Sequence, residues 1–148
     1  MAGCYIQCKS QLQSTIALST SEAEYCALSQ AMRTLLPIRE IILEFIEHVK
    51  LIDAHGKHIF KSQEHVKEFI TTIHEDNSTA LNLATNQKIT SRTKHWCIKW
   101  HFFWSHLNDK SKNMKCIKVS SEEQRADYLT KGLSRDTFEN CRKLNQGW

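Results

Sequence analysis

Hydrophobic and polar positions in the first third of the chain predict a short strand followed by a helix. The segment 13–19 alternates weakly between polar and apolar residues, which favours a strand. A helix should follow and run to about Leu36, with Ser21 as its cap and Glu24 at the capping-box position. Four residues on one stripe of that helix are spaced four, three and four apart: Glu24, Leu28, Ala31 and Leu35.

The pattern then continues through a second helical stretch, a polar connection and a strand. Pro37 should kink or restart the helix, and apolar residues at helical spacing extend it to about Lys50. The polar segment 53–68 is predicted to be a surface insertion. The β-rich segment 69–73 predicts a strand that runs directly into the sequence HEDN.

Three further elements are predicted in the second half of the chain. A helix over 78–85 should be capped by Asn77 or Ser78, and another should begin at about Ser91. One stripe of the latter holds Trp96, Trp100, Phe103 and Leu107. A strand over 114–120 and a helix over 121–132 complete the series, the helix with Ser121 as cap, Gln124 at the capping-box position and Gly132 as its end. This order of elements predicts a single α/β domain over residues 1–148.

Charge and cysteine content narrow the class of partner and the compartment. The net charge is only +4, but eight Lys or Arg residues lie between positions 88 and 118 against one acid, Asp109. Such a local excess indicates a phosphate-rich partner, with a solvated basic face as the alternative. Six cysteines without a Cys-x-x-Cys pair, a signal peptide or a membrane-length apolar run predict reduced thiols inside the cell and no membrane partner.

Three carboxylates occupy positions that suggest chemistry. Glu24 lies on the stripe of its helix that should face the core, Asp76 follows directly on a strand, and Asp127 lies among apolar neighbours in the last predicted helix. Singly, they could be a helix cap, a turn residue and an exposed side chain. Together, at the carboxyl end of a strand, they could hold Mg²⁺, which prefers oxygen ligands. Two such ions promote phosphodiester hydrolysis.

Four blocks in this order resemble one known family: STIALSTSEAEYCALSQA, HEDNSTALNLA, SRTKHWCIKWHFF and SSEEQRADYLTKGLSRDTF. The chain is similar, from about Lys9 to its end, to the ribonuclease H domain of the Pol polyprotein of copia-type LTR retrotransposons. That resemblance implies a ribonuclease H-like mixed sheet flanked by helices. It also implies endonucleolytic hydrolysis of RNA in RNA–DNA hybrids during reverse transcription, with two Mg²⁺ ions, which Mn²⁺ can replace.

The same resemblance assigns three of the four catalytic carboxylates of the family to residues of this chain and leaves the fourth without a counterpart. Three of the four family carboxylates fall on Glu24, Asp76 and Asp127, which would be catalytic and metal-binding. The fourth, carried by the first and central strand, has no counterpart, because no Asp or Glu precedes Glu22 and Asp53 lies in the wrong part of the topology. We therefore expect a truncated, catalytically impaired remnant whose unpaired strand edges favour aggregation.

The expected partners are an RNA–DNA hybrid and the reverse transcriptase portion of the parent polyprotein. Candidate contacts to the hybrid are Arg92, Lys94 and Lys99, whereas the neighbouring tryptophans should pack in the core. The location implied is a cytoplasmic virus-like particle or the nucleus, and the protein is not secreted. The alternative function is a non-catalytic nucleic-acid-binding module. An integrase core is a weaker rival, because the four blocks do not match its pattern.

Overall fold

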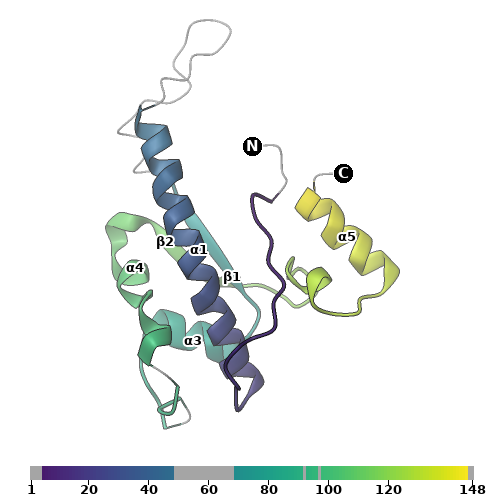
Figure 1. The fold of residues 1–148 in the computed structure, drawn as a ribbon, viewed down its shortest axis with the longest axis horizontal. Helices are drawn as coiled ribbons and strands as arrows, with labels where there is room; N and C mark the ends of the chain where they lie inside the picture. The colour runs from purple at the N-terminus through teal and green to yellow at the C-terminus, as the bar shows by residue number, and fades with distance from the viewer. Residues whose placement is uncertain (1–4, 49–68, 92, 97, 147–148) are drawn as a thin grey trace, which may run out of the picture.

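The computed structural model describes residues 5–48, 69–91, 93–96 and 98–146, and these form a mixed α/β structure (Figure 1). The predicted insertion 53–68 lies outside the described residues. The helices and strands are α1 (Thr20–His48), β1 (Thr71–Glu75), α3 (Ser78–Asn86), α4 (Trp104–Asn108), β2 (Met114–Lys118) and α5 (Arg135–Gln146). Three 3₁₀ helices lie between them, namely η1 (Ile98–His101), η2 (Lys110–Lys112) and η3 (Asp127–Leu129).

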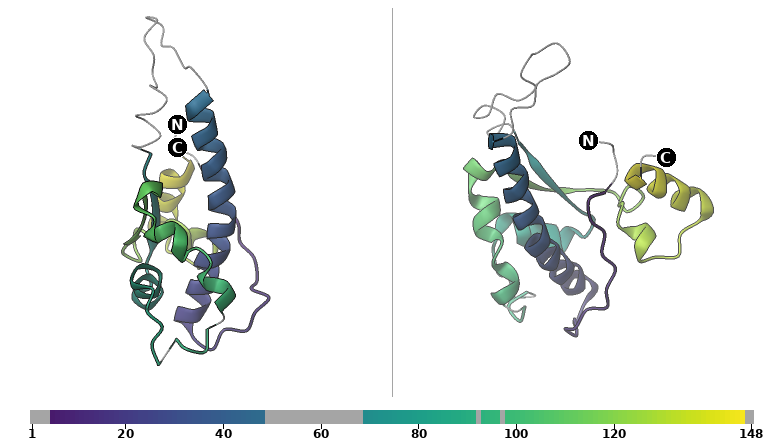
Figure 2. Two further views of the ribbon diagram at one scale, coloured as in Figure 1. Left: turned by 90° about the vertical axis from the view of Figure 1, so that its left-hand side faces the viewer. Right: turned by 45° about the horizontal axis from the view of Figure 1, so that its top comes forward.

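Two of the three predicted strands are confirmed, each within two residues of its expected start. They pair in parallel, with Thr71 opposite Met114 and Glu75 opposite Lys118. Helix α3 contacts both strands, α4 contacts β2, and α1 packs on α3, so these helices gather on one side of the sheet (Figures 1 and 2). Parallel sheets are usually covered on both faces, but the outward residues of these strands are exposed. Within the described residues, the sheet therefore has an open face and two unpaired edges.

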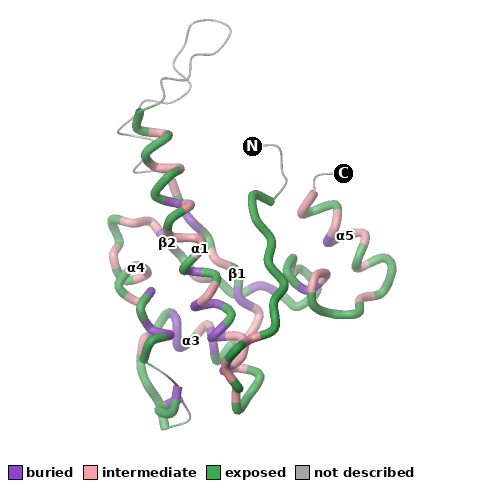
Figure 3. Tube along the Cα trace, viewed as in Figure 1, coloured by how far each residue is buried: buried purple, intermediate pink, exposed green. Residues whose placement is uncertain are grey.

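The core lies between the first half of α1, α3 and the aromatic segment before α4 (Figure 3). Tyr25 is fully buried, and its ring centroid lies 5.2 Å from that of Trp96 and 5.7 Å from that of Phe103. Its hydroxyl is hydrogen-bonded to Nδ1 of His101 at 2.7 Å. Trp96 and Trp100 are also buried, which confirms that the tryptophans pack in the core. His101 is buried with them.

Helix α1 differs from the prediction at its cap. Pro37 lies inside the helix, which continues to His48 without a restart. The cap is Ser19, whose Oγ accepts a hydrogen bond from the Glu22 amide at 3.1 Å. Ser21 and Glu24 therefore do not form the capping box. The buried face follows Tyr25, Ser29 and Met32, which leaves Glu24 at its margin.

The predicted strand over 13–19 is also wrong. These residues form no strand, because the described part of the chain offers them no neighbouring strand to bond. They follow an irregular course with bends before α1, and the residues that precede them lead toward α5 (Figures 1 and 2). A hydrogen bond from the Tyr5 amide to the Asn145 carbonyl, 3.0 Å long, connects the N-terminal segment to α5.

The helix expected from about Ser91 is replaced by turns, η1 and the short helix α4. The Thr93 hydroxyl accepts a hydrogen bond from the Thr90 amide at 3.0 Å, and such local bonds compete with a helix. Aromatic residues further lower helix propensity in this segment. The stripe of aromatic residues is thus buried without a continuous helix.

The helix predicted over 121–132 is wrong as well. Most of its backbone hydrogen bonds join residues three apart, as in the Asp127 amide to the Gln124 carbonyl at 3.2 Å, and only η3 forms. Most side chains of this segment are exposed, so there is little apolar surface to stabilise a full helix. Helix α5, which the pattern did not predict, follows instead and buries Cys141. No helix in the described residues is long and apolar enough to cross a bilayer.

Arg39 ties α1 to the starts of both strands. It is buried, its Nε donates to Thr71 Oγ1 at 3.1 Å, and its Nη2 donates to the Lys112 carbonyl just before β2. The guanidinium also lies 6.0 Å from the centroid of the Phe69 ring. Because one side chain joins three segments, it should fix the register of the sheet against the helix.

Replacing Arg39 by Met should lower the free energy of unfolding by about 2–3 kcal/mol, because it leaves Thr71 and the Lys112 carbonyl without their charged donor. Urea unfolding followed by circular dichroism measures the change. Arg135→Met is the control, since the Arg135–Glu139 pair is exposed and should contribute less than about 1 kcal/mol. Equal losses in the two variants would refute the role of Arg39.

Candidate metal centre

The N-terminal turn of α1 delivers Glu24 to the end of the sheet. Glu22, two residues earlier, is buried and accepts a hydrogen bond from the Leu18 amide at 2.8 Å, so it caps the helix entrance. Glu24, expected on the stripe that faces the core, is half-buried at the margin of that face. Because the Glu22 carboxylate bonds to the helix entrance, the half-buried Glu24 carboxylate can lie beside residues at the end of β1.

The turn from β1 into α3 delivers two more carboxylates. Asn77 Oδ1 accepts hydrogen bonds from the amides of Thr79 at 3.0 Å and Ala80 at 3.1 Å, as predicted for the cap of α3. The Asn77 amide in turn donates to Glu75 Oε1 at 2.9 Å. This compact turn fixes Asp76, which stands directly after the strand as expected, between two hydrogen-bonded residues.

Glu24, Glu75 and Asp76 meet at this end of β1. One carboxylate oxygen from each lies within 4.8 Å of those of the other two. Glu75 was not predicted as a site residue, although a signal was available. It follows Thr71 and Ile73 at alternate positions of a strand whose other side faces outward, so its carboxylate had to point inward.

Asp127 lies close to this cluster but is not part of the three-carboxylate group. It is buried in η3, and its Oδ2 accepts a hydrogen bond from Lys131 Nζ at 2.8 Å. Its negative charge still contributes to raising the pKa of Glu24. The structure therefore brings Glu24 and Asp76 together and places Asp127 within electrostatic reach.

The cluster carries more negative charge than its surroundings offset. Burial is the largest cause of the raised pKa of Glu24, followed by the charge of Asp76, while Lys131 acts in the opposite direction. Burial also raises the pKa of Glu75, against the hydrogen bond from the Asn77 amide. A divalent cation would relieve this repulsion, and carboxylate oxygens suit Mg²⁺, so the residues present fit the ion that the family resemblance implies.

Neighbouring polar groups hold Asp76 without neutralising its carboxylate. The Lys118 ammonium donates to the Asp76 main-chain carbonyl and to Ser78 Oγ, the latter at 3.0 Å. Ser121 Oγ donates to Asp76 Oδ2 at 3.4 Å. The carboxylate is thus oriented by a hydroxyl and by the backbone turn.

The predicted contacts to nucleic acid lie partly within the described residues. Lys94 and Lys99 are exposed, and Lys99 Nζ stands 4.7 Å from the Trp100 ring centroid, whereas Arg92 lies outside the described residues. Arg33 of α1, which was not predicted, also lies beside aromatic rings: its Cζ is 5.7 Å from the Trp100 ring centroid and 5.5 Å from that of Phe102. The exposed surface here is cationic and aromatic.

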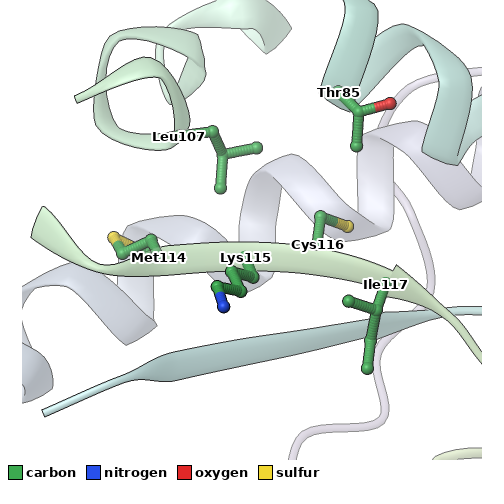
Figure 4. A pocket seen from close by; sticks show the side chains of 6 residues that line it. All are labelled: Thr85, Leu107, Met114, Lys115, Cys116 and Ile117. Atoms are coloured by element: carbon green, nitrogen blue, oxygen red, sulfur yellow. The ribbon is translucent and has the colours of Figure 1, made fainter. Parts of the chain in front are cut away.

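A shallow pocket beside β2 offers different chemistry (Figure 4). It is lined by Thr85, Leu107, Met114, Lys115, Cys116 and Ile117. Burial raises the pKa of Cys116 to about 12, so its thiol stays protonated at neutral pH and is a poor nucleophile or metal ligand. The carboxylate cluster is therefore the stronger candidate site.

Replacing Glu24 by Gln should make stability less dependent on pH. The pKa of Glu24 is raised in the folded chain, so its contribution to stability is complete below the unfolded value of about 4.3 and is lost as pH rises through the folded value. Without metal, the free energy of unfolding of E24Q should therefore increase relative to that of the native chain as pH rises. Urea midpoints across this range, with the exposed Glu44→Gln as control, measure the difference. Parallel pH profiles for E24Q and the native chain would contradict the repulsion.

No family model and no solved structure matches the chain. Several retrotransposon polyproteins are similar to it in sequence. The Retrovirus-related Pol polyprotein from transposon TNT 1-94 of Nicotiana tabacum is 31% identical over 143 residues, which cover 97% of this chain and 9% of that protein. Those from transposons RE1 and RE2 of Arabidopsis thaliana are 40% and 38% identical over 68 residues, or 46% of this chain and 4% of each protein.

The chain therefore spans less than a tenth of the length of these relatives. One alignment covers nearly all of it, including both strands and the carboxylate cluster. The homologues of the chain are thus retrotransposon Pol polyproteins, and the chain is similar to one short segment of them.

Proposed function

We propose that the chain is a ribonuclease H domain of a copia-type Pol polyprotein, with a ribonuclease H-like fold, that hydrolyses RNA in RNA–DNA hybrids. The observation that carries the proposal is the meeting of Glu24, Glu75 and Asp76 at the carboxyl end of β1. Carboxylates gathered at such an end suit divalent cations, and the similarity to Pol polyproteins makes nucleic acid the fitting substrate class.

In this proposal, Glu24, Asp76 and Asp127 hold two Mg²⁺ ions, which Mn²⁺ can replace. When bound, the ions activate the attacking water and stabilise the leaving oxygen. The chain's own residues position these carboxylates. Ser121 donates a hydrogen bond that orients Asp76, and Lys131 donates one that holds Asp127.

Recognition of the hybrid would come from the basic surface and from the sugar. Lys94 and Lys99 are exposed and can contact phosphates, and Arg92 joins them in the proposal. The ribose 2′-hydroxyl distinguishes the RNA strand from DNA. The reverse transcriptase portion of the parent polyprotein would be the physical partner, within a cytoplasmic virus-like particle or the nucleus.

A second candidate is a non-catalytic module that binds nucleic acid. It is favoured by the exposed Lys94 and Lys99, which can contact phosphates whether or not the carboxylates hold a cation. The basic surface would remain useful without chemistry. The two candidates differ in whether bound hybrid is cut.

The 148-residue chain should cut the RNA strand of a labelled RNA–DNA hybrid when Mg²⁺ is added. The rate should be on the order of 10²-fold or more below that of a relative with all four acids, because several kcal/mol of metal stabilisation are at stake. Asp76→Asn should abolish the cleavage, and Asp136→Asn, an exposed residue of α5, should leave it unchanged.

Cleavage that survives Asp76→Asn would contradict the assigned site. Hybrid binding without any Mg²⁺-dependent cleavage would identify the non-catalytic module.

Binding of the hybrid should weaken steeply with salt, because phosphate contacts release counterions. The double variant Lys94→Ala, Lys99→Ala should reduce the slope of log affinity against log salt by about two. Fluorescence anisotropy with a labelled hybrid measures the slope. Lys143→Ala, in the last turn of α5, is the control. A slope unchanged in the double variant would place the contacts elsewhere.

A further inference from the structure

The cluster contains one carboxylate that the family resemblance does not assign. Glu75 stands next to Asp76, and its oxygen lies within 4.8 Å of oxygens of both Glu24 and Asp76. The structure thus gathers a carboxylate that the resemblance does not assign beside two that it does.

We infer that Glu75 is a further metal ligand of this carboxylate cluster, beside Glu24 and Asp76. This inference rests on the proposed function, because it concerns the same cation site. It assigns to the chain a donor set of Glu24, Glu75, Asp76 and Asp127.

Burial distinguishes Glu75 from an ordinary surface acid. The residue is 5% exposed, and among the described residues no Lys, Arg or His lies within ion-pairing distance of it. Its carboxylate accepts a single hydrogen bond there, from the Asn77 amide at 2.9 Å. A buried carboxylate without a cationic partner is costly, and metal coordination is one of the ways in which proteins satisfy such a group.

The position of Glu75 is also rigid. It is the last residue of β1, its main-chain carbonyl accepts from the Val119 amide at 3.1 Å, and Lys118 is its neighbour across the sheet. A ligand on a paired strand is held more precisely than one on a loop. Glu24, from a long helix, and Asp76, from a capped turn, complete a constellation built on three fixed backbones.

The competing explanation is a structural pair in which Glu75 and Glu24 share a proton. Such a pair would also satisfy a buried carboxylate, but it would not require Glu75 for cation binding. Metal affinity and metal-free stability together separate the explanations, because removing one repelling charge should not destabilise the fold while removing a ligand should weaken the metal site.

The test compares Glu75→Gln with the native 148-residue chain. Mn²⁺ binding is followed by electron paramagnetic resonance and Mg²⁺ binding by calorimetry, with melting temperatures recorded in chelator. We expect E75Q to bind both ions at least about tenfold more weakly and to melt no lower than the native chain. Asp76→Asn is the positive control, and Glu44→Gln, exposed on α1, is the charge-matched negative control.

The outcomes separate this inference from the proposed function. Native affinity in E75Q, with a loss in D76N, would overturn the role of Glu75 and leave the proposed site standing. A native chain that binds neither ion, or a D76N variant that binds as the native chain does, would overturn the metal centre itself. If E75Q does not fold, Glu75→Met, which suits a buried position, takes its place with the same expected loss.

Discussion

Repulsion between carboxylates gathered at the end of β1 is the constraint on which the candidate site depends. The packing of α1 on the sheet and the compact turn into α3 bring Glu24, Glu75 and Asp76 together. No ion pair within the described residues offsets their charge directly, and Lys131 is committed to Asp127. The fold therefore holds like charges in one place, an arrangement that a bound cation would stabilise.

The structure around the carboxylate cluster is well packed on one side of the sheet and exposed on the other. Tyr25, Trp96 and Phe103 form an aromatic core under α1, and Arg39 fixes the helix to the starts of both strands. The outward face of the sheet and both of its edges lack partners within the described residues. The carboxylates thus lie on the well-packed side, at the end of a small two-stranded sheet.

Local signals in the sequence predicted the parts of the fold that local bonds determine. Asn77 caps α3 as its residue type suggests, the β-rich segment before it forms β1, and the tryptophan stripe is buried. The predictions over 13–19 and 121–132 were wrong because a strand needs a neighbour and a helix needs a surface to cover. Neither requirement can be read from the segment alone.

The residues of the candidate site could likewise be predicted only in part from local signals in the sequence. The placement of Asp76 after a strand was visible in sequence, but the convergence of Glu24 and Asp76 depends on how α1 lies across the sheet. Glu75 was not predicted because the expected strand ended at Ile73, whereas its inward direction follows from alternation along the observed strand Thr71–Glu75. The exchange of roles between Glu22 and Glu24 depends on a helix start two residues earlier than expected.

The most direct measurement is a crystal structure of the chain soaked in Mn²⁺, with anomalous scattering collected near the manganese edge. The account predicts an anomalous peak among the carboxylate oxygens of Glu24, Glu75 and Asp76. A structure in which these side chains bind no manganese, or in which the peak lies at another part of the surface, would contradict it.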